Sequence, residues 1–412
     1  MRKKIILFFL LMVMLSPMLT TGCWNRREIN ELAFVLASGV DRDPATGKFI
    51  VTVQIAQPSE LASAKEGKGG GTKPFEVYSA TGQTVFDAVR NLAKQVPRRL
   101  MWSHSGMVII GEQTARAGVL PLIDFFERDH DLRRTNWVIV SQGEAKKALE
   151  AAIDLETLPA RSLSGLLKYR AGVSTSTAVP LNDFLKALGS KSAGPVASWL
   201  EIIPAGTVEE KMLDEHPQGG KAEKKGEERL KPKGRLVGTA VFKGDKLAGL
   251  LNEPETRGFN WIKGKVVSGI IVVDCPRKKD GKVGIEIIDT SSKIKPGIQD
   301  NKLVMDVAIE MEGNLGDQTC TDDLSKPETV KLLEKEAAGV MTGEAREALR
   351  KTRQDYRSDI LGFGEAVHKK FPRKWQEIKK HWDEIYPDLR VNVQAKAHIR
   401  RTGITTRPTK PK

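Results

Sequence analysis

An apolar run near the N-terminus indicates where the part of the chain that folds begins. A positive Met-Arg-Lys-Lys start is followed by residues 5–19, which are almost wholly apolar, and small polar residues then lead to Cys23. Cationic, apolar and cleavage regions in this order are typical of a secretory signal peptide. The apolar run is shorter than the ~20 residues that a membrane-spanning helix needs, and Pro17 interrupts it. We therefore expect residues 1–22 to be removed and the rest to be exported.

The cleavage point resembles the lipobox of bacterial lipoproteins. Gly22-Cys23 matches the motif, although Thr20 stands where Leu is usual and Leu19 lies one place further back. In such proteins the thiol carries a diacylglyceryl group, and cleavage leaves the cysteine as an N-acylated N-terminus. Two acyl chains meet the two-signal requirement for stable anchoring, since each buried methylene contributes ~0.8 kcal/mol. We therefore predict a covalent lipid on Cys23; the alternative is an ordinary secreted protein cleaved nearby.

Length and charge bound the remaining possibilities. Removing 22 of the 412 residues leaves 390, enough for two to three domains. An apolar content of 40% with seven Trp and thirteen Phe excludes disorder of the whole chain. The formal charge is +14, about +11 without the signal, which favours an anionic membrane surface as a partner. Nucleic acid is not expected, because the sequence has no zinc-finger, RRM-like or KH-like signature and export separates the chain from it.

Alternating strand and helix patterns predict an α+β fold of three mixed domains, each with a sheet flanked by helices. The first domain, residues 23–195, begins with a hairpin over residues 33–55 and has a helix over residues 84–96 that ends at Pro97. A small, mostly β middle domain, residues 196–275, contains the charged loop 216–234 and a second hairpin turning at Lys243-Gly244-Asp245. The third domain, residues 276–412, has two long strands, helices over residues 327–361 broken at Gly339 and Gly343, a last strand and a basic tail.

No catalytic or metal site is indicated. In Ser103-His104-Ser105 neighbouring strand residues point to opposite faces, so we expect a surface histidine rather than a catalytic dyad. Gly362-Phe363-Gly364 has only half of a dinucleotide fingerprint and is interpreted as a junction between helices. The six histidines have no zinc-ligand spacing. Cys275 and Cys320 can form one disulfide or remain buried thiols.

Two clusters of cations and aromatic residues are candidate contact sites for a partner or a membrane. The first cluster, in residues 98–102, contains the Arg and Trp that are typical of interfaces, but a capped strand edge has the same composition. The second cluster, in residues 369–375, suits contact with an anionic lipid surface or a partner groove. The alternative is a solvated helix face whose Trp packs inward. The candidate residues are Arg98, Arg99 and Trp102 in the first cluster, and Lys369, Lys370, Arg373, Lys374 and Trp375 in the second.

Ordered motifs along the mature chain resemble the Ger(x)C family, the lipoprotein C subunits of spore germinant receptors. Each motif is modest alone, and their joint order is specific. They are Gly22-Cys23-Trp24-Asn25-Arg26-Arg27-Glu28-Ile29, Arg98-Arg99-Leu100-Met101-Trp102-Ser103-His104, Val241-Phe242-Lys243-Gly244-Asp245, Glu255-Thr256-Arg257-Gly258, Leu361-Gly362-Phe363-Gly364-Glu365 and Arg400-Arg401-Thr402-Gly403.

The resemblance implies a non-enzymatic lipoprotein on the outer face of the spore inner membrane, needed for nutrient-triggered germination. It implies a three-domain α+β architecture and association with integral-membrane A and B subunits. It implies no cofactor apart from the lipid on Cys23. Contact with a small-molecule germinant is left open. The alternative is an exported solute-binding or hydrolytic lipoprotein that acts alone, with a ligand cleft between two halves of similar size.

Overall fold

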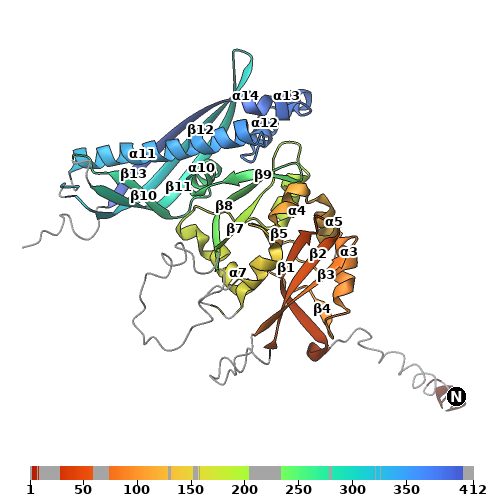
Figure 1. Cartoon of the computed structure of the whole chain (residues 1–412). Coiled ribbons are helices and arrows are strands. Elements are labelled where there is room, and N and C mark those ends of the chain that lie inside the picture. Colours follow the sequence, from red (N-terminus) through yellow and green to blue (C-terminus); the bar gives the residue numbers. More distant parts are fainter. Residues whose placement is uncertain are drawn as a thin grey trace, which may run out of the picture.

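The structure is a computed structural model in which two β-sheets, each packed against helices, follow one another along the chain (Figure 1). It describes residues 2–6, 8, 28–58, 74–128, 131–151, 156, 158–203, 233–277, 281–320, 322–324 and 326–401. The predicted lipidation residue Cys23, residues 216–232 of the predicted charged loop and the tail 402–412 lie outside the described residues.

The first sheet has nine strands in the order β3-β2-β1-β5-β6-β7-β8-β9, with β4 pairing with β1. Neighbouring strands are parallel from β1 through β5 and β6 to β7, and antiparallel on both sides of this centre. The strands are β1 (Leu32–Arg42), β2 (Phe49–Ala56), β3 (Phe75–Gly82), β4 (Arg99–Met101), β5 (Met107–Gly111), β6 (Trp137–Ser141), β7 (Val196–Ile203), β8 (Lys233–Lys243) and β9 (Lys246–Leu251).

Helices cover both faces of the first sheet. Val108 and Ile110 of β5 pack in one core with α3 (Val85–Leu92), α5 (Leu120–Arg128) and α8 (Leu181–Leu188). Met107 and Ile109 pack in the other core with α6 (Ala145–Glu150) and α7 (Pro159–Tyr169). Successive strand residues point to opposite faces, so a strand buried on both faces is apolar at every position. The remaining short helices are η1 (Ile29–Glu31), α4 (Glu112–Ala117) and η2 (Arg170–Gly172).

Local patterns predicted several of these elements. The side chain of Thr84 accepts a hydrogen bond from the backbone N–H of Asp87, which starts α3 where the sequence places a helix. The predicted hairpins are confirmed, because β1 pairs antiparallel with β2 and β8 with β9.

The second sheet has the order β10-β11-β12-β13. β11 and β12 form a long hairpin whose turn contains Asp300 and Asn301, both with positive φ (48° and 57°), as two-residue hairpin turns require. β13 is parallel to β12. Figure 1 shows α11 lying along one face of this sheet. The elements are β10 (Gly269–Asp274), β11 (Lys282–Gln299), β12 (Lys302–Gln318), β13 (Arg390–Arg401), α10 (Glu253–Lys263), α11 (Pro327–Arg350), the π-helix η4 (Lys351–Asp355), α12 (Phe363–Lys370), α13 (Pro372–Ile378) and α14 (Trp382–Asp388).

The helix α11 corrects one prediction. The sequence predicted a break at Gly339 and Gly343, but α11 runs through both to Arg350. The two glycines lie on the exposed side, whereas Leu333 and Met341 belong to a stripe that is buried every fourth residue. Burial of such a stripe outweighs the cost of about 1 kcal/mol for each glycine in a helix.

The α+β class and the flanking helices are confirmed, but the described residues form two sheets where three were expected. The predicted middle domain, residues 196–275, contributes β7, β8 and β9 to the first sheet and β10 to the second. β7 joins the predicted middle domain to the first sheet, because it pairs in parallel with β6, where Ile139 lies opposite Ser198. Parallel pairing with a distant strand needs a long crossover and leaves no local sequence signal.

A disulfide joins Cys275, just after β10, to Cys320, just after β12, with an S–S distance of 2.03 Å. Of the two states that the sequence allowed, the structure therefore has the oxidised one. Both cysteines are buried. A Cβ atom on Gly281 would lie 3.0 Å from the sulfur of Cys275, so a side chain at this position would crowd the disulfide.

Candidate functional site

The first group of predicted contact residues surrounds β4, which pairs in parallel with the start of β1. In this pairing Arg99 lies opposite Leu32, and both Arg98 and Arg99 are exposed. Trp102, by contrast, is only 4% exposed and packs in the core on the α3 side of the sheet. Its predicted role as a contact residue is corrected accordingly, because a buried indole is not available to a partner.

The second group lies on α12 and α13. Trp375 is 4% exposed, and its ring packs between His368 (5.8 Å between ring centroids) and Trp382 (5.3 Å). Trp375 is therefore a core residue as well, as the alternative of an inward-packed Trp predicted.

The cations around Trp375 remain near the surface, and three of them have partners of their own. Lys369 pairs with Glu365 at 2.7 Å, and Lys374 pairs with Glu377 at 2.9 Å. Lys370 donates to the carbonyl oxygen of Pro296 at 2.7 Å. Arg373 is exposed.

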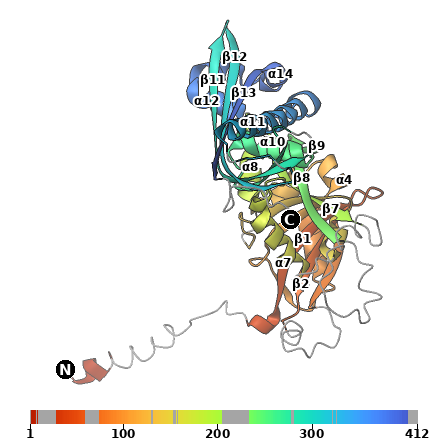
Figure 2. The ribbon, with the colours of Figure 1, turned by 90° about the vertical axis from the view of Figure 1, so that its left-hand side faces the viewer.

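The structure does not bring the two groups together. Figures 1 and 2 show α12 and α14 at the top of the molecule, while Figure 1 shows β4 at the bottom, beyond the whole first sheet. The two groups therefore cannot form one continuous contact surface.

A short segment that the sequence did not single out as a site joins the two sheets. Ser358 donates its hydroxyl hydrogen to the carbonyl oxygen of Phe242 at 2.6 Å, and Tyr356 donates to that of Leu250 at 2.5 Å. The backbone N–H of Gly194 in turn donates to the carbonyl oxygen of Asp359 at 2.8 Å. The only signal for this junction in the sequence is the Gly362-Phe363-Gly364 motif that follows it.

Asp359 is the most buried ionisable group of the junction. Its carboxylate accepts backbone hydrogen bonds from Gly362 (2.8 Å), Phe363 (3.1 Å) and Gly364 (2.7 Å), and one from the indole N–H of Trp382 at 3.1 Å. Burial raises the pKa of Asp359 from 3.8 to about 6, and these four hydrogen bonds act in the opposite direction. The carboxylate fixes the start of α12, since it satisfies N–H groups that have no partner within the helix.

A second polar cluster links α10 to α11. Arg257 forms an ion pair with Glu344 and donates to both of its carboxylate oxygens, one of which also accepts a hydrogen bond from the indole N–H of Trp261 at 2.9 Å. Arg257 also donates to the carbonyl oxygen of Ile270 at 3.0 Å, on the edge strand β10. A Cβ atom on Gly258 would lie 2.0 Å from the carbonyl oxygen of Glu344, so the two helices are in backbone contact there.

A set of exposed apolar side chains lies where the segment after η2 meets the segment before β10 and the edge strand β10 itself. It consists of Val173, Val267, Ile270 and Val272, which are 50% to 60% exposed. We call these residues the β10 strip. The hydroxyl of Ser174 donates to the carbonyl oxygen of Ser268 at 2.7 Å, so the two parts of the strip are held together. Exposed apolar side chains gathered at a sheet edge are typical of protein interaction surfaces.

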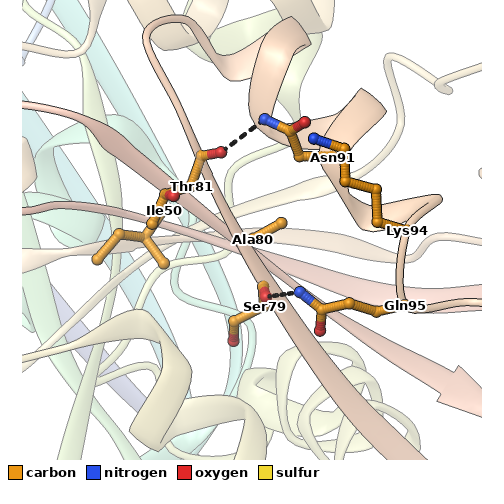
Figure 3. A pocket seen from close by; sticks show the side chains of 7 residues that line it. All are labelled: Ile50, Ser79, Ala80, Thr81, Asn91, Lys94 and Gln95. Atoms are coloured by element: carbon orange, nitrogen blue, oxygen red, sulfur yellow. Dashed lines mark hydrogen bonds between the residues drawn. The ribbon is translucent and has the colours of Figure 1, made fainter.

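A polar pocket of about 360 Å³ lies at the other end of the first sheet, between the edge strand β3 and α3 (Figure 3). Asn91 and Gln95 donate from their side chains to the carbonyl oxygens of Thr81 and Ser79, both at 2.9 Å. These bonds satisfy acceptors on the outer edge of β3 and so protect it against pairing with another strand.

The described contacts of His104 and Ser105 are those of ordinary packing and backbone hydrogen bonding. His104 packs edge-on against Phe34, and Ser105 donates to the carbonyl oxygen of Met107 at 3.3 Å. Within the described part of the chain, no three or more His, Cys, Asp or Glu side chains are grouped so that they could hold a metal ion. None of the described helices is both long and apolar enough to cross a membrane.

Two family models match the chain in sequence order. The model for the spore germination protein N-terminal domain matches residues 25–202, and the model for the spore germination B3/GerAC-like C-terminal domain matches residues 237–403. Between them they span both sheets. The chain belongs to the GerAC-like family of spore germination proteins.

Full-length relatives within this family agree with that assignment. The chain is 27% identical to spore germination protein KC of Bacillus subtilis (strain 168), covering 97% of this chain and 96% of that protein. It is 22% identical to spore germination protein B3 of the same organism, covering 94% of each chain. The crystal structure of the GerBC protein shares the fold, with a TM-score of 0.54 at 16% identity over 89% of this chain and 98% of that one.

Three of the sequence motifs that carry the resemblance lie at or near the junction rather than around a pocket. Phe242, in the motif of residues 241–245, accepts the hydrogen bond from Ser358. Arg257 and Gly258, in the motif of residues 255–258, contact Glu344 of α11. Gly362 and Gly364 bind the carboxylate of Asp359. The motif of residues 241–245 thus takes part in the contact between the two sheets, while the motif of residues 255–258 joins α10 to α11.

Proposed function

We propose that this chain is the lipid-anchored C subunit of a spore germinant receptor, and that it acts without catalysis through contacts with integral-membrane A and B subunits. Its place is the outer face of the spore inner membrane. The observation that carries the proposal is the ordered match of both family models over residues 25–202 and 237–403.

Two features of the structure support export and assembly. The buried disulfide between Cys275 and Cys320 suits a compartment outside the reducing cytosol. The β10 strip offers apolar side chains at a sheet edge, where a partner protein can bury them. Both features fit a subunit that is tethered outside the cytoplasm and works by contact.

The proposal is tested by mass spectrometry of the N-terminal peptide of the detergent-extracted native protein, together with identification of the proteins that co-purify. We expect a diacylated Cys23 and two integral-membrane companions. In the Cys23→Ala variant we expect loss from the membrane fraction and loss of nutrient-triggered germination. An unmodified N-terminus without companions would overturn the receptor assignment, and full membrane binding and activity of Cys23→Ala would overturn the anchor.

The alternative of a solute-binding lipoprotein predicts a ligand cleft between two halves of the chain. The pocket described above lies instead at the β3 edge of the first sheet and is open and polar (Figure 3). Activity of the purified chain alone on a solute would favour this alternative over the receptor subunit.

A further inference from the structure

The pairing of β4 with β1 places two arginines close to the predicted anchor. Leu32 is the first residue of β1 and lies opposite Arg99 in the parallel pairing. Leu32 follows Cys23 by only nine positions in the sequence. A peptide of that length spans at most ~30 Å when fully extended. A lipid on Cys23 therefore keeps the β4 end of the first sheet near the membrane.

The side chains at this end suit an anionic surface. Arg98 and Arg99 are exposed, and neither forms an ion pair within the described part of the chain. Ile29, in η1 directly before β1, is 74% exposed and offers an apolar side chain to the interface. Glu28 and Glu31 lie beside it, whereas the sequence supplies Arg26 and Arg27 between them and the anchor.

The cations on α12 and α13 lie at the opposite end of the molecule from β4 (Figure 1). One flat membrane cannot meet both ends at once. Because Cys23 lies only nine positions before β1, a lipid on it would bring the β4 end to the membrane.

We propose that Arg98 and Arg99, with Ile29, rest on the anionic lipid surface that holds Cys23, and that α12 and α13 point away from this membrane. The inference deepens the proposed function and rests on its lipid anchor. It distinguishes the two groups of cations and aromatic residues: the group at β4 faces lipid, and the group on α12 and α13 does not.

The test uses the mature chain with Cys23→Ala, so that acyl chains do not contribute to binding. Co-sedimentation is measured with vesicles of equimolar phosphatidylglycerol and phosphatidylcholine, and with phosphatidylcholine alone. Each arginine held at an anionic surface contributes ~1 kcal/mol, so Arg98→Ala/Arg99→Ala should weaken binding to the anionic vesicles about 30-fold. Arg98→Lys/Arg99→Lys keeps the charge and should bind nearly as well as the parent. The matched control, Lys369→Ala/Arg373→Ala, removes two cations at the other end and should leave binding unchanged.

Three results would overturn the inference. They are no binding of the parent to anionic vesicles, no loss of binding in Arg98→Ala/Arg99→Ala, and an equal or larger loss in Lys369→Ala/Arg373→Ala. Thermal unfolding of each variant shows whether it is folded; if the alanine pair is not, Arg98→Gln/Arg99→Gln replaces it. Failure of the anchor is detected separately, because it is read from the mass of the native N-terminal peptide.

Discussion

The indole N–H of Trp382 donates to the buried carboxylate of Asp359 at 3.1 Å, which ties α14 to the start of α12. The backbone of the same aspartate accepts a hydrogen bond from Gly194, before β7. One residue thus connects the helical end of the second sheet with the first sheet. Its ionisation should therefore be visible in the stability of the whole chain.

The first prediction concerns Asp359 and pH. Burial raises the pKa of Asp359 from 3.8 to about 6. The carboxyl group of Asp359 therefore binds a proton more tightly in the folded chain than in the unfolded chain. The stability that this difference contributes is fully present below pH ~4 and is lost as the pH rises through ~6. At about 1.4 kcal/mol per pKa unit, the loss is about 3 kcal/mol.

The Asp359→Asn variant cannot titrate at this position and keeps an acceptor oxygen for the backbone N–H groups. We expect the free energy of unfolding of the parent to fall relative to that of the variant between pH 4 and 7, as measured by urea unfolding at a series of pH values. Asp43 is partly exposed, and hydrogen bonds with Thr46 and Ala45 lower its pKa. It serves as the control site, since Asp43→Asn should leave this part of the pH profile unchanged. Parallel profiles for the parent and Asp359→Asn would contradict the prediction.

The second prediction concerns the glycines of α11. A Cβ atom on Gly339 or Gly343 would meet no atom within 4 Å, and both residues have ordinary helical backbone. Alanine at either position should raise the free energy of unfolding by about 0.5 to 1 kcal/mol, because it lowers the entropy of the unfolded chain.

The matched control for these two variants is Gly258→Ala in α10. There the new Cβ would lie 2.0 Å from the carbonyl oxygen of Glu344, so α10 and α11 would have to separate. We expect a clear fall in the thermal unfolding midpoint for Gly258→Ala and a rise for the two α11 variants. Destabilisation of all three would show that α11 needs its glycines.

The sequence predicted those strands and turns that are determined by a few neighbouring residues. The alternation of Val51, Val53 and Ile55 predicted β2, and Lys243-Gly244-Asp245 predicted the β8–β9 turn, in which Gly244 has a φ of +59°. These features act within a few residues, so the chain carries them wherever it folds.

The sequence did not predict the features that depend on contacts between residues far apart in the chain. Trp102 and Trp375 stand among cations in the sequence, yet both side chains turn into a core. The candidate contact groups were found as sequence clusters, but only the β4–β1 pairing shows which of them lies near the anchor. The Gly362-Phe363-Gly364 motif marks the local part of the junction around Asp359, but its contacts with Gly194 and Trp382 have no signal in the sequence because these residues lie outside that motif.

The third prediction concerns the disulfide. Cys275 and Cys320 are separated by 45 positions, so their bond restricts a sizeable loop in the unfolded chain. The double variant Cys275→Ala/Cys320→Ala should lose about 2 to 4 kcal/mol of unfolding free energy. Denaturant unfolding of the parent with and without a reductant provides the control, since reduction should lower its stability in the same direction. A reductant-insensitive midpoint, together with parent-like stability of the double variant, would contradict a stabilising bond.

The fourth prediction concerns the β10 strip and the proposed receptor partners. Ile270 and Val272 are half exposed on the edge strand β10, so lysine at these positions should change the thermal unfolding midpoint little. It should, however, greatly reduce co-purification with the integral-membrane subunits, because a charge would be buried in the contact. Leu332→Lys is the matched control: Leu332 is 46% exposed on α11, outside the strip. The lipid-anchored protein is captured from detergent extracts for each variant. Undiminished recovery of partners by Ile270→Lys/Val272→Lys would remove the strip from the assembly surface, whereas a loss confined to that variant would identify β10 as the edge that meets the receptor.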